Sequence, residues 1–283
     1  MSSAASKVKA TTTDVAPGAR SASLLLLVAG VYATRTAEAA EPPDARDASR
    51  PCRPTISCTA ELTSPGTLEV ETGAQASKLG DRSRALSFPF LLKQTVAPFL
   101  QLQLGSNGYT TTTASPHGRY LDNLFVGPKF HVADQKKWVP AFAIGGQWSF
   151  PTFEGVGYSR NHDAFLTGFA SKDLGPIHVD LNLGANIYRL EAPQAQAFAA
   201  LALSASLPKT PFSAGLEGYV FSDASPVATR DAGARFFIGL SPRTWLVFDF
   251  GGDVGFFPST RAYSMFVGMT IVPVIFFRTH EPR

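Results

Sequence analysis

The chain has 283 residues, of which 17% are charged, and its formal net charge is +3 at pH 7. Its length allows one large domain or two small ones, and its charged fraction lies below the roughly 25% that is typical of a soluble domain. No basic patch indicates a nucleic-acid partner. Low charge combined with 24 Gly and 22 Phe suits a wall that is apolar on its outside without being helical.

Residues 1–39 have the pattern of an export signal. A positive region containing Lys7, Lys9 and Arg20 precedes a Leu-rich core at 22–33, and the Ala-Glu-Ala at 37–39 offers a cleavage site. The core is too short for a membrane-spanning helix, which needs about 20 residues. We therefore expect a cleaved signal peptide over 1–39, with the exact cleavage site and start codon left open. The alternative is a disordered tail that stays attached.

Two cysteines, Cys52 and Cys58, follow the signal closely. In an exported chain, a close pair of this kind is most simply a small disulfide. Two thiols without a nearby His fill only half of a tetrahedral zinc shell, so we expect no metal site here. We predict a short periplasmic segment over 40–66, clipped by this disulfide.

From residue 67 to residue 275, most segments alternate apolar residues with polar or small ones. In the clearest of them, 177–188, Ile177, Val179 and Leu181 fall on one face, and His178 and Asp180 fall on the other. Successive side chains of a strand point to opposite faces, so the pattern predicts ribbons with one apolar and one polar side. Strands are expected at 67–77, 84–92, 97–105, 121–133, 138–150, 162–172, 176–189, 195–207, 211–222, 229–240, 244–256 and 263–275.

The connections between these segments alternate in length. Tight turns are expected at 93–96, 134–137, 173–175, 208–210 and 241–243, and longer connectors at 106–120, 151–161 and 223–228. In outer-membrane barrels, the periplasmic turns are short and the outside loops are long. With twelve up-and-down strands, every tight turn and both termini then fall on the periplasmic side. The long loop at 106–120 is a candidate to cap the barrel mouth.

Aromatic residues are expected to form two bands. Trp138 and Trp245 lie near strand starts after periplasmic turns, while Trp148, Phe150 and Phe256 lie near strand ends on the outer side. Two bands separated by the length of a strand match the aromatic girdles at the two interfaces of a membrane. The alternative is a set of core aromatics in a soluble β protein, which would be extracted without detergent.

The opposite face of the strands, which would line the lumen, carries a mixture of acidic, basic and amide side chains. Acids and bases at like depth on neighbouring strands, such as Glu217 and Arg235, are positioned to pair across the wall. One interpretation is a structural network, and the other is a narrow pore whose ion selectivity is set by acids on the first and eleventh strands. The candidate lumen-facing residues are Glu69, Glu71, Lys129, His131, His178, Asp180, Glu217, Arg235, Asp249 and Asp253, accompanied by the amides Gln101, Gln103 and Gln147.

No catalytic constellation is complete. The Ser-Asn-Gly at 106–108 resembles part of an outer-membrane phospholipase motif, but no His lies two residues before Ser106 to activate the hydroxyl. His162 and Asp163 stand near the outer mouth in the reverse of the order found in outer-membrane proteases. No phosphate-binding loop and no metal-ligand spacing is present in the sequence. We therefore expect no enzyme activity, no catalytic residue, no metal and no cofactor.

Several short motifs resemble those of one family, the outer-membrane transporters named after the phenol meta-pathway. The segment 88–109 is similar to that family's strand-turn-strand, usually written "Leu-Leu-Lys-Tyr-Gly-Leu-Thr". Segments 65–71, 122–130, 138–141 and 150–152 resemble its opening strand and its "Gly-Leu-Lys-Tyr", "Pro-Ala" and "Leu-Pro-Thr-Gly" signatures. Gln94 and Thr95 replace the usual Tyr-Gly, and Phe153 replaces the usual Gly. The resemblance implies an outer-membrane barrel that passes small, often hydrophobic molecules, and it transfers no catalytic or ligand residue.

Together these features predict an all-β protein, a single up-and-down antiparallel transmembrane β-barrel of about twelve strands in the outer membrane of a Gram-negative cell. It would span residues 67–275 and be followed by a C-terminal tail at 276–283. The leading functional hypothesis is a porin-like channel for passive passage of a small solute, hydrophobic or aromatic in class. The expected partners are membrane lipid and that solute, with no nucleic acid. The alternative is a non-conducting barrel with a structural or surface-binding role.

Overall fold

The computed structural model describes residues 48–113, 118–152, 162–189, 193–224, 229–257 and 261–277. The expected signal at 1–39 and the end of the expected tail, 278–283, lie outside these residues. The strands are β1 (Thr67–Leu79), β2 (Arg84–Ala97), β3 (Leu100–Thr112), β4 (Gly118–Leu121), β5 (Leu124–Ala133), β6 (Ala141–Phe150), β7 (Ala164–Leu174), β8 (Ile177–Arg189), β9 (Pro193–Ser206), β10 (Phe212–Phe221), β11 (Asp231–Arg243), β12 (Leu246–Gly255) and β13 (Arg261–Ile275).

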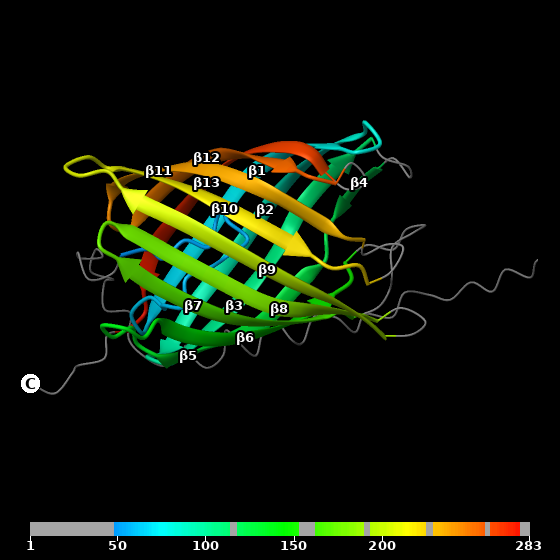
Figure 1. Cartoon of the computed structure of the whole chain (residues 1–283). Helices are drawn as coiled ribbons and strands as arrows, with labels where there is room; N and C mark the ends of the chain where they lie inside the picture. The colour runs from blue at the N-terminus through cyan, green and yellow to red at the C-terminus, as the bar shows by residue number, and fades with distance from the viewer. Residues whose placement is uncertain are drawn as a thin grey trace, which may run out of the picture. The chain divides into compact units, whose positions relative to one another are not determined.

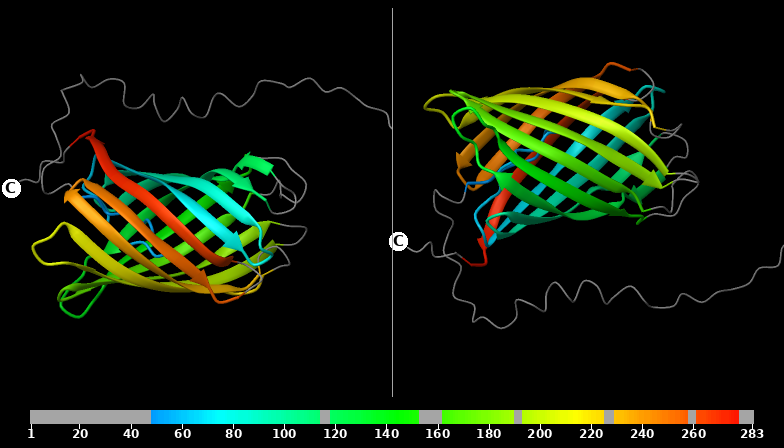
Figure 2. Two further views of the ribbon diagram at one scale, coloured as in Figure 1. Left: turned by 90° about the horizontal axis from the view of Figure 1, so that it is seen from above. Right: turned by 60° about the horizontal axis from the view of Figure 1, so that its bottom comes forward.

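All these strands belong to one antiparallel sheet that closes on itself. Neighbours along the chain are neighbours in the sheet, β13 pairs with β1, and the β2–β3 pairing joins the two ends of the strand order. The short β4 pairs with β3 alone and extends one hairpin, so the remaining twelve strands form the barrel (Figures 1 and 2). The predicted fold class is confirmed. Among the described residues, no helix is long and apolar enough to cross a membrane.

The alternation of the sequence decides which side chains face outward. On β8, Leu183 is 52% exposed, whereas its neighbour Asn182 is 2% exposed. On β12, Phe248 and Phe250 are exposed while Asp249 between them is buried. Because the side-chain period of a strand is two, each strand places its apolar set outside and its polar set inside. The barrel is thus apolar outside and polar inside, as a lipid-facing wall requires.

Three of the expected connections are wrong. The tight turn placed at 93–96 is strand, because β2 continues to Ala97 and the turn follows at Pro98 and Phe99. The tight turn placed at 241–243 is also strand, because β11 continues to Arg243 and the turn follows at Thr244 and Trp245. Residues 106–112 of the expected long loop continue β3, where they pair with β2 and β4. A run of threonines favours a strand, since β-branched side chains fit a pleated surface. The segment therefore lengthens the wall as a hairpin and does not fold over the mouth as a loop.

The short connections gather at one end of the barrel, and both ends of the described chain lie there too. Ala97 connects to Leu100, and Leu174 connects to Ile177, through two residues each. Gly66 leads into β1 with a φ of +89°, and a Cβ at this position would collide with the carbonyl oxygen of Phe277. Only glycine fits such a close approach of two backbones. By the length rule for barrel connections, this end is the periplasmic one.

Candidate functional site

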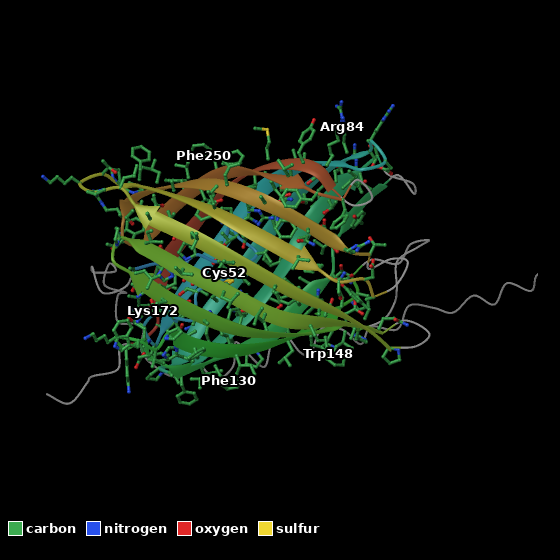
Figure 3. All side chains as sticks on the ribbon, viewed as in Figure 1. Cys52, Arg84, Phe130, Trp148, Lys172 and Phe250 are labelled. Carbon is green, nitrogen blue, oxygen red and sulfur yellow. A yellow bond between two sulfur atoms is a disulfide. The ribbon has the colours of Figure 1, made fainter. Side chains whose placement is uncertain are left out.

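Residues 48–66, called the lumen segment below, run inside the barrel and fill part of it. The segment contacts the inner faces of β1, β2, β5, β7, β8, β10 and β11. Cys52, labelled in Figure 3, lies within the barrel outline and is 5% exposed. The sequence predicts a short periplasmic segment with a disulfide over 40–66; the described part of that range, 48–66, lies in the lumen. The sequence of this segment has no periodic pattern that would predict its position in the lumen. The buried charges of the wall, however, require partners, and the segment supplies some of them.

A disulfide joins Cys52 and Cys58 within the lumen segment. The amide of Asn182 fixes the second cysteine. In the orientation that satisfies both of its polar atoms, its nitrogen donates to the Cys58 carbonyl at 2.9 Å and its oxygen accepts from the Cys58 N–H at 2.7 Å. The disulfide closes a loop of the lumen segment, and such a cross-link restricts the conformations available to the chain.

The first charged cluster lies where the lumen segment passes β1 and β2. Lys93 Nζ lies 3.0 Å from Glu69 Oε1 and 2.5 Å from Glu71 Oε1, and all three side chains are buried. The lumen segment adds backbone donors: Arg50 N–H donates to Glu69 at 3.1 Å, and Cys52 and Arg53 N–H groups donate to Glu71 at 2.9 Å each. Buried carboxylates are costly without such partners. The segment therefore supplies three backbone donors to carboxylates whose only cation on the wall is Lys93, among the described residues.

Lys93 is a lumen residue that the sequence analysis missed. The sequence predicts a turn at 93–96, but these residues belong to β2, where Lys93 and Thr95 alternate with outward-facing neighbours and are buried inside the barrel. Thr95 Oγ1 is also part of the site, since it shares a hydrogen bond of 2.7 Å with Thr63 Oγ1 of the lumen segment. Extending the alternation as far as Pro98 would have found both residues.

The second cluster anchors the middle of the lumen segment to β10, β11 and β12. Glu217 accepts hydrogen bonds from the N–H groups of Ile56 at 2.9 Å and Ser57 at 2.7 Å, and from Ser57 Oγ at 2.7 Å. The ion pair expected between Glu217 and Arg235 is present, with Arg235 Nη1 3.6 Å from Glu217 Oε2. Arg235 also pairs with Asp253, Nη2 to Oδ2 at 3.0 Å, and donates to the Pro54 carbonyl.

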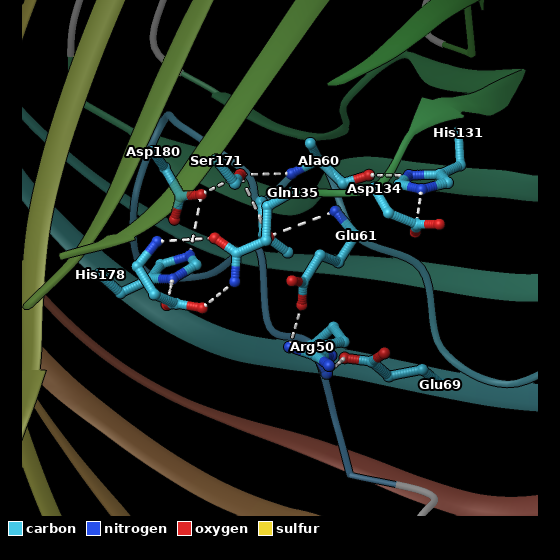
Figure 4. Close-up of polar contacts among 12 residues, drawn as sticks. Arg50, Ala60, Glu61, Glu69, His131, Asp134, Gln135, Ser171, His178 and Asp180 are labelled. Carbon is cyan, nitrogen blue, oxygen red and sulfur yellow. Dashed lines mark hydrogen bonds and ion pairs between the residues drawn. The ribbon is translucent and has the colours of Figure 1, made fainter. Parts of the chain in front are cut away.

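The third cluster holds the returning part of the lumen segment (Figure 4). Lys129 donates to the Thr59 carbonyl and lies 4.5 Å from the centre of the Phe169 ring. Ser171 Oγ accepts from Ala60 N–H at 2.6 Å, and His131 Nδ1 lies 3.1 Å from the Ala60 carbonyl oxygen. These contacts bind the segment chiefly through its backbone atoms. They therefore depend on the course of the backbone more than on the identity of the side chains.

His178 and Asp180 extend this cluster along β8. The His178 ring lies between two carboxylates, with Nδ1 2.7 Å from Asp173 Oδ1 and Nε2 3.1 Å from Asp180 Oδ1. Asp180 Oδ1 also accepts from Ser171 Oγ at 2.5 Å. The chain of contacts thus links the lumen segment, through Ser171, to polar residues near the periplasmic turn.

Asp249 is the one predicted lumen residue without a hydrogen bond in the described part of the chain. Both carboxylate oxygens are buried and have no hydrogen-bond partner among the described residues. Gly268 on the neighbouring strand leaves room for them, since a Cβ there would lie within 3.0 Å of both oxygens. The Arg53 guanidinium of the lumen segment lies over Gly73, the residue of β1 that pairs with Gly268, so a positive side chain lies on the same part of the wall as this acid.

The residues considered for catalysis have structural partners instead. Ser106 Oγ donates to the Asp122 carbonyl at 2.9 Å and accepts from Gly108 N–H at 2.8 Å. The His162 ring stacks on Trp148 at 5.9 Å, and its Nδ1 lies 3.2 Å from the Ser149 carbonyl oxygen. Within the described ranges, no group of three or more His, Cys, Asp or Glu residues is placed to hold a metal ion.

Comparison with known proteins supports the barrel and names its family. The family model described as "Putative MetA-pathway of phenol degradation" matches residues 53–271. Among solved structures, the COG4313 outer membrane channel from Pseudomonas putida F1 superimposes with a TM-score of 0.55 at 14% identity, covering 75% of this chain and 97% of that one. The NanC porin superimposes with a TM-score of 0.52 at 8% identity, covering 72% and 98%. A comparison with curated protein sequences finds no match.

The family match covers more than half of the chain, and both structural likenesses agree with the closed barrel described above. The bacterial outer membrane is where barrels of this kind reside, and the apolar outer face suits it. The protein is therefore a channel-like outer-membrane β-barrel that belongs to the family of the "Putative MetA-pathway of phenol degradation".

Proposed function

We propose that the barrel is a channel for passive passage of a small solute, and that the lumen segment closes it at rest. The observation that carries this proposal is the way in which the segment is held. It lies inside a closed barrel but outside the strand ladder, and it is attached by hydrogen bonds and ion pairs to wall side chains such as Glu71, Lys129 and Glu217. A segment attached in this way can loosen while the wall stays intact.

The barrel dimensions suit a small solute. Eight-stranded barrels are filled by their own side chains, and sixteen-stranded porins leave an open aqueous channel. A barrel of twelve strands lies between them, so its interior admits a chain segment of this thickness or, once that segment moves, a solute of similar width. The charged clusters inside favour a solute with a polar or ionised group.

We also propose that the solute is aromatic, and this part of the proposal is supported by the family. Its description refers to phenol degradation, and the Pseudomonas putida relative is described as an outer membrane channel. A small aromatic molecule that carries a hydroxyl or carboxylate would fit both the charged lumen and the family description. A transport function requires no catalytic residue, and Ser106 and His162 both contact backbone carbonyl groups.

A non-conducting barrel with a structural or surface-binding role is the second candidate. The same lumen segment favours it, because the segment bonds to strands all around the barrel and buries the charges that a pore would expose. The two candidates differ in whether the segment ever leaves its position.

Solute flux into proteoliposomes tests the proposal. The refolded full chain would be reconstituted, and the uptake of 4-hydroxybenzoate and of a neutral pentose sugar would be compared with that of protein-free liposomes. Glu217→Gln, which weakens the attachment of the lumen segment, should raise uptake above that of the unmodified chain. The channel proposal fails if neither protein passes either probe while both migrate as folded, heat-modifiable barrels, and the non-conducting barrel then becomes the leading candidate.

A further inference from the structure

A basic groove lies on the outer surface of the barrel, at the end opposite the termini. It crosses the ends of β13, β1, β2, β3 and β4 and has a volume of about 820 Å³. Besides Ser and Thr residues, its lining includes three basic side chains and three large apolar or aromatic ones: Lys78, Arg84, Arg119, Leu86, Tyr263 and Met265. None of these residues belongs to the lumen site, which lies on the other face of the wall.

Strand register places these residues in two outward rows. In the row nearer the rim, Tyr263 pairs with Lys78, and Lys78 pairs with Arg84. In the next row, Met265 and Leu86 flank Ala76, and their side chains are 67% and 39% exposed. The cations therefore lie at the level where the apolar outer band ends. Figure 3 shows Arg84 pointing away from the barrel at this rim.

The pairing of Lys78 with Arg84 is unfavourable in isolation. Like charges directly opposite each other on neighbouring strands destabilise a sheet. Lys78 Nζ lies 5.7 Å from the centre of the Tyr263 ring, and Lys78, Arg84 and Arg119 form no ion pair with any described residue. The neighbouring acid, Asp81, accepts a hydrogen bond from Ser83 N–H at 2.8 Å. Three cations thus line one groove, and no acid among the described residues forms an ion pair with them.

We propose that this groove binds the phosphate groups of a phosphorylated glycolipid in the outer leaflet of the membrane. Lys78, Arg84 and Arg119 contact the phosphates, and the acyl chains lie along Leu86 and Met265 below them. Arg and Lys bind phosphate through charge-assisted hydrogen bonds, and basic residues at a membrane surface attract anionic headgroups. The apolar residues Leu86 and Met265 beside the basic residues favour a lipid over a free anion, because only a lipid has acyl chains that can contact them.

Binding of diphosphorylated lipid A to the full chain in detergent micelles tests this inference. The double variant Lys78→Gln/Arg84→Gln removes the opposed cations. A matched control, Lys137→Gln/Lys209→Gln, removes two cations at the periplasmic end, where Lys137 lies 5.6 Å from the Trp138 ring centre. We expect the groove variant, which lacks two cations, to bind roughly 30-fold more weakly than the unmodified chain and the control to bind as well as the unmodified chain.

Two results would overturn the inference. One is equal affinity of the groove variant and the control for lipid A, with both proteins migrating as heat-modifiable barrels. The other is complete displacement of lipid A from the unmodified chain by millimolar inorganic phosphate, which would assign the groove to a free anion. A dephosphorylated lipid A should bind the unmodified chain as weakly as lipid A binds the groove variant.

Discussion

The substitution Glu217→Gln should release the middle of the lumen segment while leaving the barrel wall intact. In the folded chain, the Glu217 carboxylate accepts hydrogen bonds from the Ile56 and Ser57 N–H groups and from Ser57 Oγ. Hydrogen bonds to a charged group contribute about 1.5–3 kcal/mol each, against about 0.5–1.5 kcal/mol for neutral pairs. Gln keeps one acceptor oxygen but loses the charge, so we expect the attachment to weaken by roughly 2–4 kcal/mol.

Hydrogen exchange measures this change directly. Every 1.4 kcal/mol is a factor of ten in an equilibrium, so a loss of this size should speed the exchange of the Ile56 and Ser57 amides by about 30- to 1,000-fold. Amides in the β7–β8 ladder should exchange as before. The control Asp223→Asn changes an exposed carboxylate that is 3.8 Å from Arg230. Unchanged exchange at Ile56 and Ser57 in Glu217→Gln would refute our reasoning that this carboxylate holds the segment.

Three further substitutions probe the remaining parts of the structure. Lys93→Met leaves two buried carboxylates without their cation and should lower the free energy of unfolding by about 3–5 kcal/mol, measured by urea titration of the refolded barrel. Phe250→Arg places a charge on the lipid face of β12 and should cost about 2–4 kcal/mol, against about 0–1 kcal/mol for Phe256→Arg at the outer edge. Replacing Cys52 and Cys58 together by Ser should speed amide exchange within the lumen segment by about tenfold, with the heat-modifiable migration of the barrel unchanged.

Each of these expectations has a clear contrary result. For Lys93→Met, a loss no greater than that of Lys209→Met, in an exposed turn, would mean that the cluster on β1 and β2 contributes little. Equal costs for Phe250→Arg and Phe256→Arg would contradict the depth assigned to the outer face. If the cysteine variant exchanged no faster within residues 48–66, the disulfide would have no part in ordering that segment.

The barrel could be predicted from the sequence because its strands carry a strict period. On β8, the alternation of Ile177 and Val179 with His178 and Asp180 survives in the structure, since a lipid-facing wall tolerates no slip of register. The lumen-facing parity of Glu217 and Arg235 followed from the same rule, and their cross-strand pairing gave the ion pair. The alternation of apolar and polar residues therefore predicts both the lipid-facing and the lumen-facing side chains of a strand.

The lumen segment could not be predicted in this way. Residues 48–66 form no strand among the described elements, and they bind the wall largely through backbone groups, as Cys52 does with Glu71 and Ala60 does with Ser171. Backbone donors are the same in every sequence, so they leave no pattern to read. The only available signal was indirect: buried acids such as Glu69 and Glu71 need more partners than the wall supplies.

The measurement that tests the closed lumen most directly is single-channel conductance in planar bilayers. We would compare the unmodified chain with Glu217→Gln and with the control Asp223→Asn. If the lumen segment closes the barrel, the unmodified chain and the control should be silent or open rarely, and Glu217→Gln should open far more often. Steady, identical open steps from all three proteins would contradict it, because a barrel held closed by residues 48–66 cannot conduct while Glu217 still holds Ile56 and Ser57.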